Sequence, residues 1–222
     1  MASREIEKRR RQESRSLKRN RASINIAPTI LIVCEGKNTE PSYFNNLKLQ
    51  SVTLRAVGEG YNTISLVIRA EELAREKHYE EVWCIFDKDD FSAQNFNTAI
   101  TMAQSKGFKV AYSNQAFEYW ILLHFNNHQG GRIDRKEYGN LINRELVPLG
   151  AYYDGGGDKN ISPKVFNLMF SNDPRLHIPR HMLAIERSKQ IYERNNHRSP
   201  ALEESSTTMH IFLEHLLTFK RY

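Results

Sequence analysis

Short runs of β-branched and apolar residues recur through the first half of the chain, separated by segments with helical spacing. The run Thr29–Cys34 is apolar without alternation, which is typical of a strand covered on both faces of a parallel sheet. Three further strands are predicted at 52–57, 82–86 and 109–113, and helical spacing lies between them. This β-α-β-α-β-α-β order predicts an α/β fold with a four-stranded parallel sheet, flanked by helices and joined by right-handed crossovers.

After residue 116 the pattern is helical only. Helices are predicted at about 117–125, 134–146, 162–171, 180–194 and 207–219, and a loop with three consecutive glycines separates two of them. We therefore divide the chain into a basic flexible arm (1–23), an α/β core (24–125) and an all-helical C-terminal extension packed on that core (126–222).

The charge of the chain is unevenly distributed. Residues 1–23 hold nine Lys/Arg and three Glu, which equals the net charge of +6 of the whole 222-residue chain, so the remainder is neutral. Such an arm is either a solvated tail or a sequence-independent contact to nucleic-acid phosphates. The arm residues predicted to bind nucleic acid are Arg9, Arg10, Arg11, Lys18 and Arg19.

Several classes of protein do not match this composition. The longest apolar runs are five residues, too short for a membrane span or a signal peptide, so a cytoplasmic protein without membrane contact is expected. Two cysteines, Cys34 and Cys84, lie in apolar runs, and no zinc-ligand spacing is present. A GxxxxGK[ST] phosphate loop is also absent, which argues against a nucleotide hydrolase.

Acidic residues stand where the predicted parallel strands end. Glu35 follows the first strand, Asp87, Asp89 and Asp90 follow the third, and Glu118 comes shortly after the fourth. The carboxyl ends of parallel strands share one edge, and carboxylates gathered there repel each other unless a cation lies among them. Hard oxygen ligands favour Mg²⁺ or Mn²⁺. The alternative is that each acid only forms a turn or caps a helix.

Three motifs in order then resemble a known family. They are ILIVCEGKNTEPSYF from residue 30, VWCIFDKDDF from residue 82 and SNQAFEYWILLHF from residue 113. Together they resemble the RloB-like proteins, small Toprim-related proteins of bacterial defence and restriction loci, over roughly residues 19–220. The resemblance implies a Toprim-like sheet, the magnesium-binding α/β unit of topoisomerases, primases and OLD-type nucleases.

The resemblance also implies roles for individual residues. Glu35, Asp87 and Asp89 correspond to the metal-site acids, Asp90 to the adjacent acid, and Glu118 to a further catalytic acid. Additional expected contributors are Glu40 at a second ion, Lys37 and Lys164 at nucleic-acid phosphates, and His124 as a support residue. Glu35 is alternatively a general base, Lys37 a solvent-facing lysine and His124 a metal ligand. The loop 155–157 with Lys159 is more simply an ordinary connection than a phosphate cradle.

The expected function is therefore Mg²⁺- or Mn²⁺-dependent hydrolysis of a phosphodiester in RNA, including tRNA, or in DNA. The resemblance further suggests an effector of bacterial anti-phage defence, of the abortive-infection type, that works with a partner ATPase. The alternative is a non-catalytic subunit that binds nucleic acid or the ATPase. Assembly into a homodimer is left open.

Overall fold

The parallel sheet predicted from the sequence is present in the structure, a computed structural model that describes residues 28–48, 53–58, 63–89 and 91–219. Four strands run parallel in the order β2 (Thr53–Gly58), β1 (Thr29–Cys34), β3 (Glu81–Asp87) and β4 (Lys109–Asn114). This order places β1 and β3 at the centre, so their carboxyl ends lie side by side. The α/β fold class is therefore confirmed.

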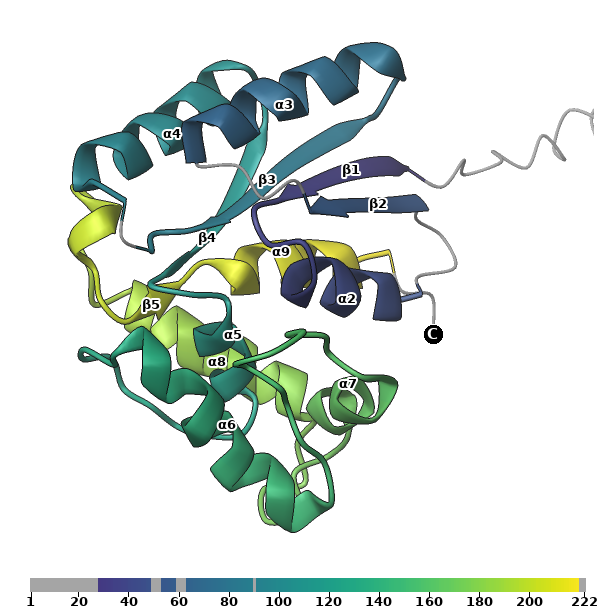
Figure 1. The fold of residues 1–222 in the computed structure, drawn as a ribbon, viewed down its shortest axis with the longest axis vertical. Coiled ribbons are helices and arrows are strands. Elements are labelled where there is room, and N and C mark those ends of the chain that lie inside the picture. The colour runs from purple at the N-terminus through teal and green to yellow at the C-terminus, as the bar shows by residue number, and fades with distance from the viewer. Residues whose placement is uncertain (1–27, 49–52, 59–62, 90, 220–222) are drawn as a thin grey trace, which may run out of the picture.

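Helices cover both faces of the sheet (Figure 1). Helices α3 (Thr63–Glu76) and α4 (Ala93–Ser105) lie on one face, and α2 (Thr39–Asn46) and α9 (Met209–Leu217) lie on the other. Side chains of β1 pack into the core on both faces of the sheet. Ile30 and Ile32 belong to one core cluster, whereas Leu31 and Val33 belong to the other. Because both faces are buried, β1 is apolar at every position after the first, as its lack of alternation predicts.

The C-terminal part contributes helices and one short strand. The helices are α5 (Glu118–Leu123), α6 (Tyr138–Leu146), α7 (Pro163–Phe170) and α8 (Arg180–Tyr192), with 3-10 turns η1 (Arg135–Glu137), η2 (Val147–Leu149) and η3 (Pro200–Leu202). The strand, β5 (Ser206–Thr207), pairs antiparallel with β4, which the expectation of an all-helical extension does not include. Hydroxyl contacts fix it, since Ser113 Oγ lies 3.0 Å from Thr207 Oγ1. A polar two-residue strand has no apolar period for sequence analysis to detect.

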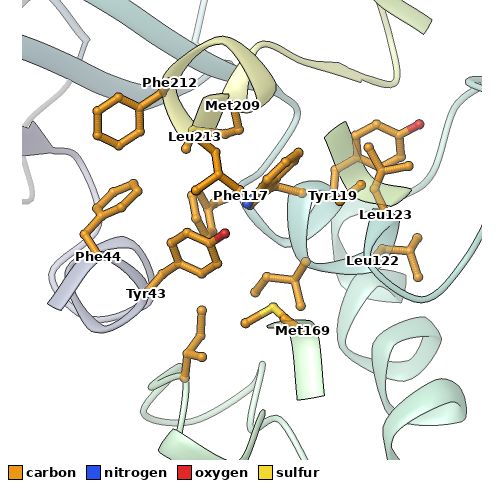
Figure 2. Packing of buried hydrophobic residues seen from close by; sticks show 14 of the residues in the cluster. Tyr43, Phe44, Phe117, Tyr119, Leu122, Leu123, Met169, Met209, Phe212 and Leu213 are labelled. Atoms are coloured by element: carbon orange, nitrogen blue, oxygen red, sulfur yellow. The ribbon is translucent and has the colours of Figure 1, made fainter. Parts of the chain in front are cut away.

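Aromatic side chains join α9 to the sheet and to α2 (Figure 2). The ring of Phe212 lies 4.5 Å from that of Trp83 and 5.3 Å from that of Phe44, measured between centroids. Phe117, just before α5, continues this cluster at 5.5 Å from Tyr43. Helix α9 is thus an integral part of the core beneath the sheet, and the ring of Phe44 lies between Phe212 and Phe117, which precedes α5.

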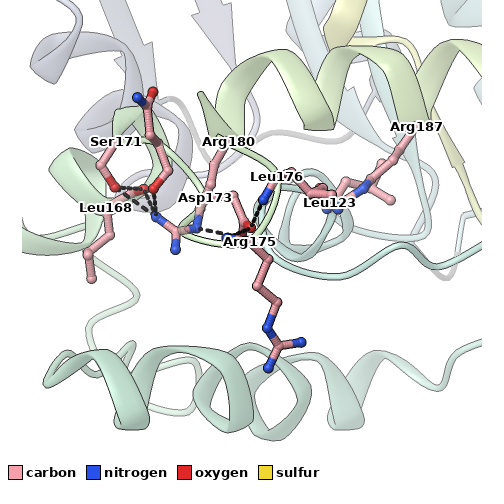
Figure 3. A network of polar contacts seen from close by, with 9 residues as sticks. Leu123, Leu168, Ser171, Asp173, Arg175, Leu176, Arg180 and Arg187 are labelled. Atoms are coloured by element: carbon pink, nitrogen blue, oxygen red, sulfur yellow. Dashed lines mark hydrogen bonds and ion pairs between the residues drawn. The ribbon is translucent and has the colours of Figure 1, made fainter. Parts of the chain in front are cut away.

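A buried arginine organises the helices around α8 (Figure 3). Arg180 is 5% exposed, and its Nη1 donates to Ser171 Oγ at 2.8 Å and to the Asn172 carbonyl at 3.1 Å. Further along α8, Arg187 Nη1 donates to the Leu123 carbonyl at the end of α5, at 2.7 Å. Helix α8 is thereby tied to the ends of both α7 and α5. Among the described residues, no helix has the length and apolar composition needed to cross a bilayer.

Candidate functional site

Four of the predicted acids surround one cavity at the carboxyl edge of the sheet. Glu35 directly follows β1, Asp87 is the last residue of β3, Glu40 lies in α2, and Glu118 opens α5. All four line a cavity of about 290 Å³. Its remaining walls are formed by Gly36, Lys37, Asn38, Thr39, Arg135 and Lys159. The cavity, which we call the acidic cavity, lies where ligands generally bind in open α/β sheets.

The turn after β1 places two of these acids. The Gly36 amide donates to Glu40 Oε1 at 3.1 Å, and the Asp87 amide donates to Glu35 Oε2 at 3.3 Å. A side chain at Gly36 would not fit, because its Cβ would stand 2.1 Å from Glu40 Oε2. The end of β2 is equally close, since a Cβ on Gly58 would be 2.2 Å from the Gly36 carbonyl oxygen. Glycine at 36 therefore allows Glu40 to fold back over the turn.

The other two acids are held by α5 and by the loop after α6. Asp87 Oδ2 accepts a hydrogen bond from the Phe117 amide at 3.0 Å, so Asp87 also satisfies a backbone donor at the start of α5. Tyr153 donates its hydroxyl hydrogen to Glu118 Oε1 at 3.0 Å, and Thr39 Oγ1 lies 3.3 Å from the same hydroxyl. Sequence reasoning did not identify Tyr153 or Thr39, because nothing local marks a tyrosine in an extended loop as a partner of Glu118.

Burial and mutual repulsion raise the pKa values of three of these carboxylates, Glu35, Glu40 and Asp87. Burial, followed by repulsion from Glu40 and Asp89, raises the pKa of Glu35 to about 7. Burial together with repulsion from Glu118 also raises the pKa of Glu40 to about 7, although the Gly36 amide opposes the shift. The pKa of Asp87 lies well above its ordinary value because of burial and the charges of Glu40, Glu118 and Glu35. A nearby cation would relieve this repulsion.

Asp89 is placed differently from its predicted role. The prediction that Asp87 and Asp89 share one ion assumes that strand alternation continues beyond Asp87. Strand β3 ends there, and Asp89 has a left-handed backbone with φ of 43°. Its side chain makes an ion pair with Arg135 and is not part of the acidic cavity wall. The Asp-x-Asp spacing therefore does not place both carboxylates in that wall, and Asp90 lies outside the described residues.

Arg135 was not identified from the sequence, although it contributes positive charge to the site. It lies in η1 and lines the acidic cavity, and its positive charge offsets a small part of the rise in the pKa values of Glu35 and Glu40. Lys37 and Lys159 also line the cavity. Among the described residues, neither lysine has an ion-pair partner. The cavity thus combines carboxylates with cations that are available to oppose negative charge.

The donor chemistry fits a hard divalent cation, because the cavity offers carboxylate oxygens and no sulfur or imidazole ligand. Glu35, Glu40, Asp87 and Glu118 are the residues that would hold it. As the side chains stand, however, the described residues contain no group of three or more His, Cys, Asp or Glu that could hold a metal ion. A cation could therefore be held here only if the side chains of these acids moved toward one another.

Two further predicted residues, His124 and Lys164, are described by the structure and do not line the acidic cavity. His124 is fully buried, donates from Nδ1 to the Trp120 carbonyl at 2.9 Å, and has its pKa lowered to about 3 by burial. It is a neutral residue of the core beside α5. Lys164 is exposed in the first turn of α7 and does not line the acidic cavity. The arm residues Arg9, Arg10, Arg11, Lys18 and Arg19 lie outside the described residues.

A comparison with protein-family models matches the RloB-like protein model over residues 30–216. The chain belongs to the RloB-like protein family. The matched region of this RloB-like protein runs from β1 to α9 and includes all four acids of the cavity. No curated protein and no solved structure gives a significant match.

Proposed function

We propose that this RloB-like protein is a Mg²⁺- or Mn²⁺-dependent nuclease that hydrolyses phosphodiester bonds. The observation that carries the proposal is the convergence of Glu35, Glu40, Asp87 and Glu118 around one cavity at the carboxyl edge of a parallel sheet. Burial and neighbouring carboxylates raise the pKa values of Glu35, Glu40 and Asp87, and such perturbed groups cluster at functional sites. The Toprim-like assignment of this sheet belongs to the same proposal.

Each side chain has a role that follows from its position. Asp87 and Glu35, at the ends of the two central strands, are the ion ligands, and Glu118 and Glu40 complete the set. A bound divalent cation would lower the pKa of a water ligand and neutralise charge on the phosphate oxygens. Lys37 and Lys159 bind the phosphate groups beside the scissile bond, and Tyr153 orients Glu118 through its hydroxyl.

The biological setting is supported by family membership and by the charge distribution. We place the protein in bacterial anti-phage defence, acting on RNA, including tRNA, or on DNA together with a partner ATPase. The carboxylates determine which bond is cut, not which sugar the substrate contains. The basic arm supplies sequence-independent attraction to the polyanion, which the acidic cavity would otherwise repel.

A second candidate is a non-catalytic subunit that binds nucleic acid or the ATPase. Two observations favour it: the described acids form no group able to hold a metal ion as they stand, and Asp87 already has a structural partner in the Phe117 amide. In this case the acids would serve only to fix the turn after β1 and the start of α5.

A cleavage assay separates the two candidates. The full chain is incubated with single-stranded and duplex RNA and DNA in Mg²⁺, in Mn²⁺ or in EDTA, with and without a candidate partner ATPase. The nuclease proposal expects metal-dependent cutting that is lost in Asp87→Asn and Glu35→Gln and retained in Glu76→Gln, a control on the exposed surface of α3. Cutting that survives both substitutions contradicts the site. Absence of cutting on every substrate favours the binding subunit.

A further inference from the structure

A second, larger cavity adjoins the acidic cavity. It has a volume of about 490 Å³, within the usual range for ligand pockets, and it shares Glu118, Arg135 and Lys159 with the acidic cavity as common walls. Its other walls come from η1, α6 and the loop after η2, namely Lys136, Tyr138, Gly139, Asn140, Asn143, Tyr152, Asp154, Gly155 and Gly156. We call it the tyrosine cavity. A nucleic-acid strand with one phosphate at the acidic cavity would extend directly into the tyrosine cavity.

The tyrosine cavity is cationic where it is open to a ligand. Lys136 and Lys159 line it, and neither has an ion-pair partner among the residues that the structure describes. Of its two acids, Asp154 accepts a hydrogen bond from the Gly157 amide at 2.9 Å, and Glu118 accepts one from Tyr153. The two lysines are therefore the groups available to an incoming anion.

An exposed aromatic ring completes this cavity. The side chain of Tyr152 is 65% exposed although it is large and planar, whereas the next residue, Tyr153, is fully buried against Glu118. The backbone here is fixed, because Asn143 Nδ2 donates to the Tyr153 carbonyl and the Tyr153 amide donates to Asn143 Oδ1, both at 2.8 Å. The backbone next to Tyr152 is thus fixed, and its exposed ring lines a cavity that carries two lysines.

We propose that the tyrosine cavity binds an unpaired nucleotide of the nucleic-acid substrate, with its base stacked on Tyr152 and its phosphates at Lys136 and Lys159. An aromatic face combined with nearby cations is the usual means of binding single strands without sequence preference. A base inside a duplex is already stacked and cannot cover the Tyr152 ring. The nucleotide next to the cleaved bond is therefore unpaired, either in a single strand or in a loop of the substrate. That the nucleotide lies next to a cleaved bond rests on the proposed function. That the tyrosine cavity binds an unpaired nucleotide does not.

The test measures binding without cleavage. The full chain, in EDTA, is titrated into strands of about ten nucleotides, a length within the range of single-strand binding sites, made as RNA and as DNA. Each strand carries one 2-aminopurine, whose fluorescence is quenched when it stacks, and a matched blunt duplex is run beside it. The variants are Tyr152→Ala, Tyr152→Trp and Lys136→Ala. Lys77→Ala, at an exposed position directly after α3, is the matched lysine control.

Quenching is expected on the single strand and not on the duplex. Tyr152→Ala should lose the quenching and bind on the order of tenfold more weakly, while Tyr152→Trp restores both. Lys136→Ala should weaken binding and reduce its salt dependence, and Lys77→Ala should do neither. The RNA and DNA series then show which sugar is preferred.

Contrary outcomes are equally distinct. The inference is overturned if Tyr152→Ala binds and quenches as the wild type does, if the duplex depends on Tyr152 equally, or if no strand binds. Tyr152-dependent binding by a protein that cuts nothing would support binding at the tyrosine cavity and contradict the nuclease proposal. Metal-dependent cutting with an unchanged KM in Tyr152→Ala would support the nuclease proposal and contradict binding at the tyrosine cavity.

Discussion

Replacing Glu40 by glutamine should make the protein more stable at alkaline pH. Glu40 is only 3% exposed and lies beside other carboxylates, which together raise its pKa from 4.5 to about 7. A glutamine has nearly the same shape, and its amide oxygen can still accept the hydrogen bond from the Gly36 amide. The substitution therefore removes mainly the buried charge.

The size of the effect follows from the pKa shift. Because the pKa of Glu40 is higher in the folded state, folding is favoured below pH 4.5, and this advantage is lost as the pH rises through 7. A shift of this size is worth about 3 kcal/mol at pH 8 and less than about 1 kcal/mol at pH 5. Glu40→Gln should accordingly raise the free energy of unfolding by up to about 3 kcal/mol at pH 8, and by much less at pH 5.

Urea unfolding followed by circular dichroism at pH 5 and pH 8, in EDTA, measures both values. Glu76→Gln, on the exposed surface of α3, is the matched control and should change the stability by less than about 0.5 kcal/mol at either pH. The reasoning is refuted if Glu40→Gln destabilises the protein at pH 8, or if its effect is the same at both pH values. Either result would mean that burial and the neighbouring carboxylates do not destabilise the charged form of Glu40.

Three further predictions concern the fold. Phe212→Ala should destabilise the protein by about 3–5 kcal/mol in urea unfolding because it removes a buried ring beneath the sheet, whereas Ile211→Ala, 42% exposed, should cost less than about 1 kcal/mol. Burial lowers the pKa of His210 to about 4, so stability should fall by about 2 kcal/mol between pH 7 and pH 4.5, and His210→Asn should reduce that fall. Arg187→Met should lower stability by about 1–2 kcal/mol through loss of the bond to the Leu123 carbonyl, with unchanged affinity for nucleic acid in an anisotropy assay; weaker binding would contradict this structural role.

The parts of the fold that the sequence predicts well are those with local causes. The run Thr29–Cys34 is a strand in the structure with the predicted bounds, because a two-face burial pattern requires apolar residues at successive positions. The acids Glu35 and Asp87 meet because parallel neighbouring strands must end at the same edge. Both inferences depend only on short segments and on the order of the elements.

The features that the sequence does not reveal depend on contacts between distant segments. Arg135 reaches Asp89 across 46 residues, and Tyr153 reaches Glu118 across 35, without any local pattern that marks either pair. Asp89 was misplaced for a related reason. Spacing alone cannot reveal that β3 ends at Asp87 and that the backbone then becomes left-handed.

Whether the acidic cavity binds a divalent cation can be measured with Mn²⁺ by electron paramagnetic resonance, since free and protein-bound Mn²⁺ give different signals. We expect that the full chain binds Mn²⁺, that Mg²⁺ displaces it, and that Asp87→Asn and Glu35→Gln abolish binding while Glu76→Gln preserves it. Absence of bound Mn²⁺ in the wild-type protein, or equal binding in all variants, would contradict the assignment of these carboxylates as the cation site.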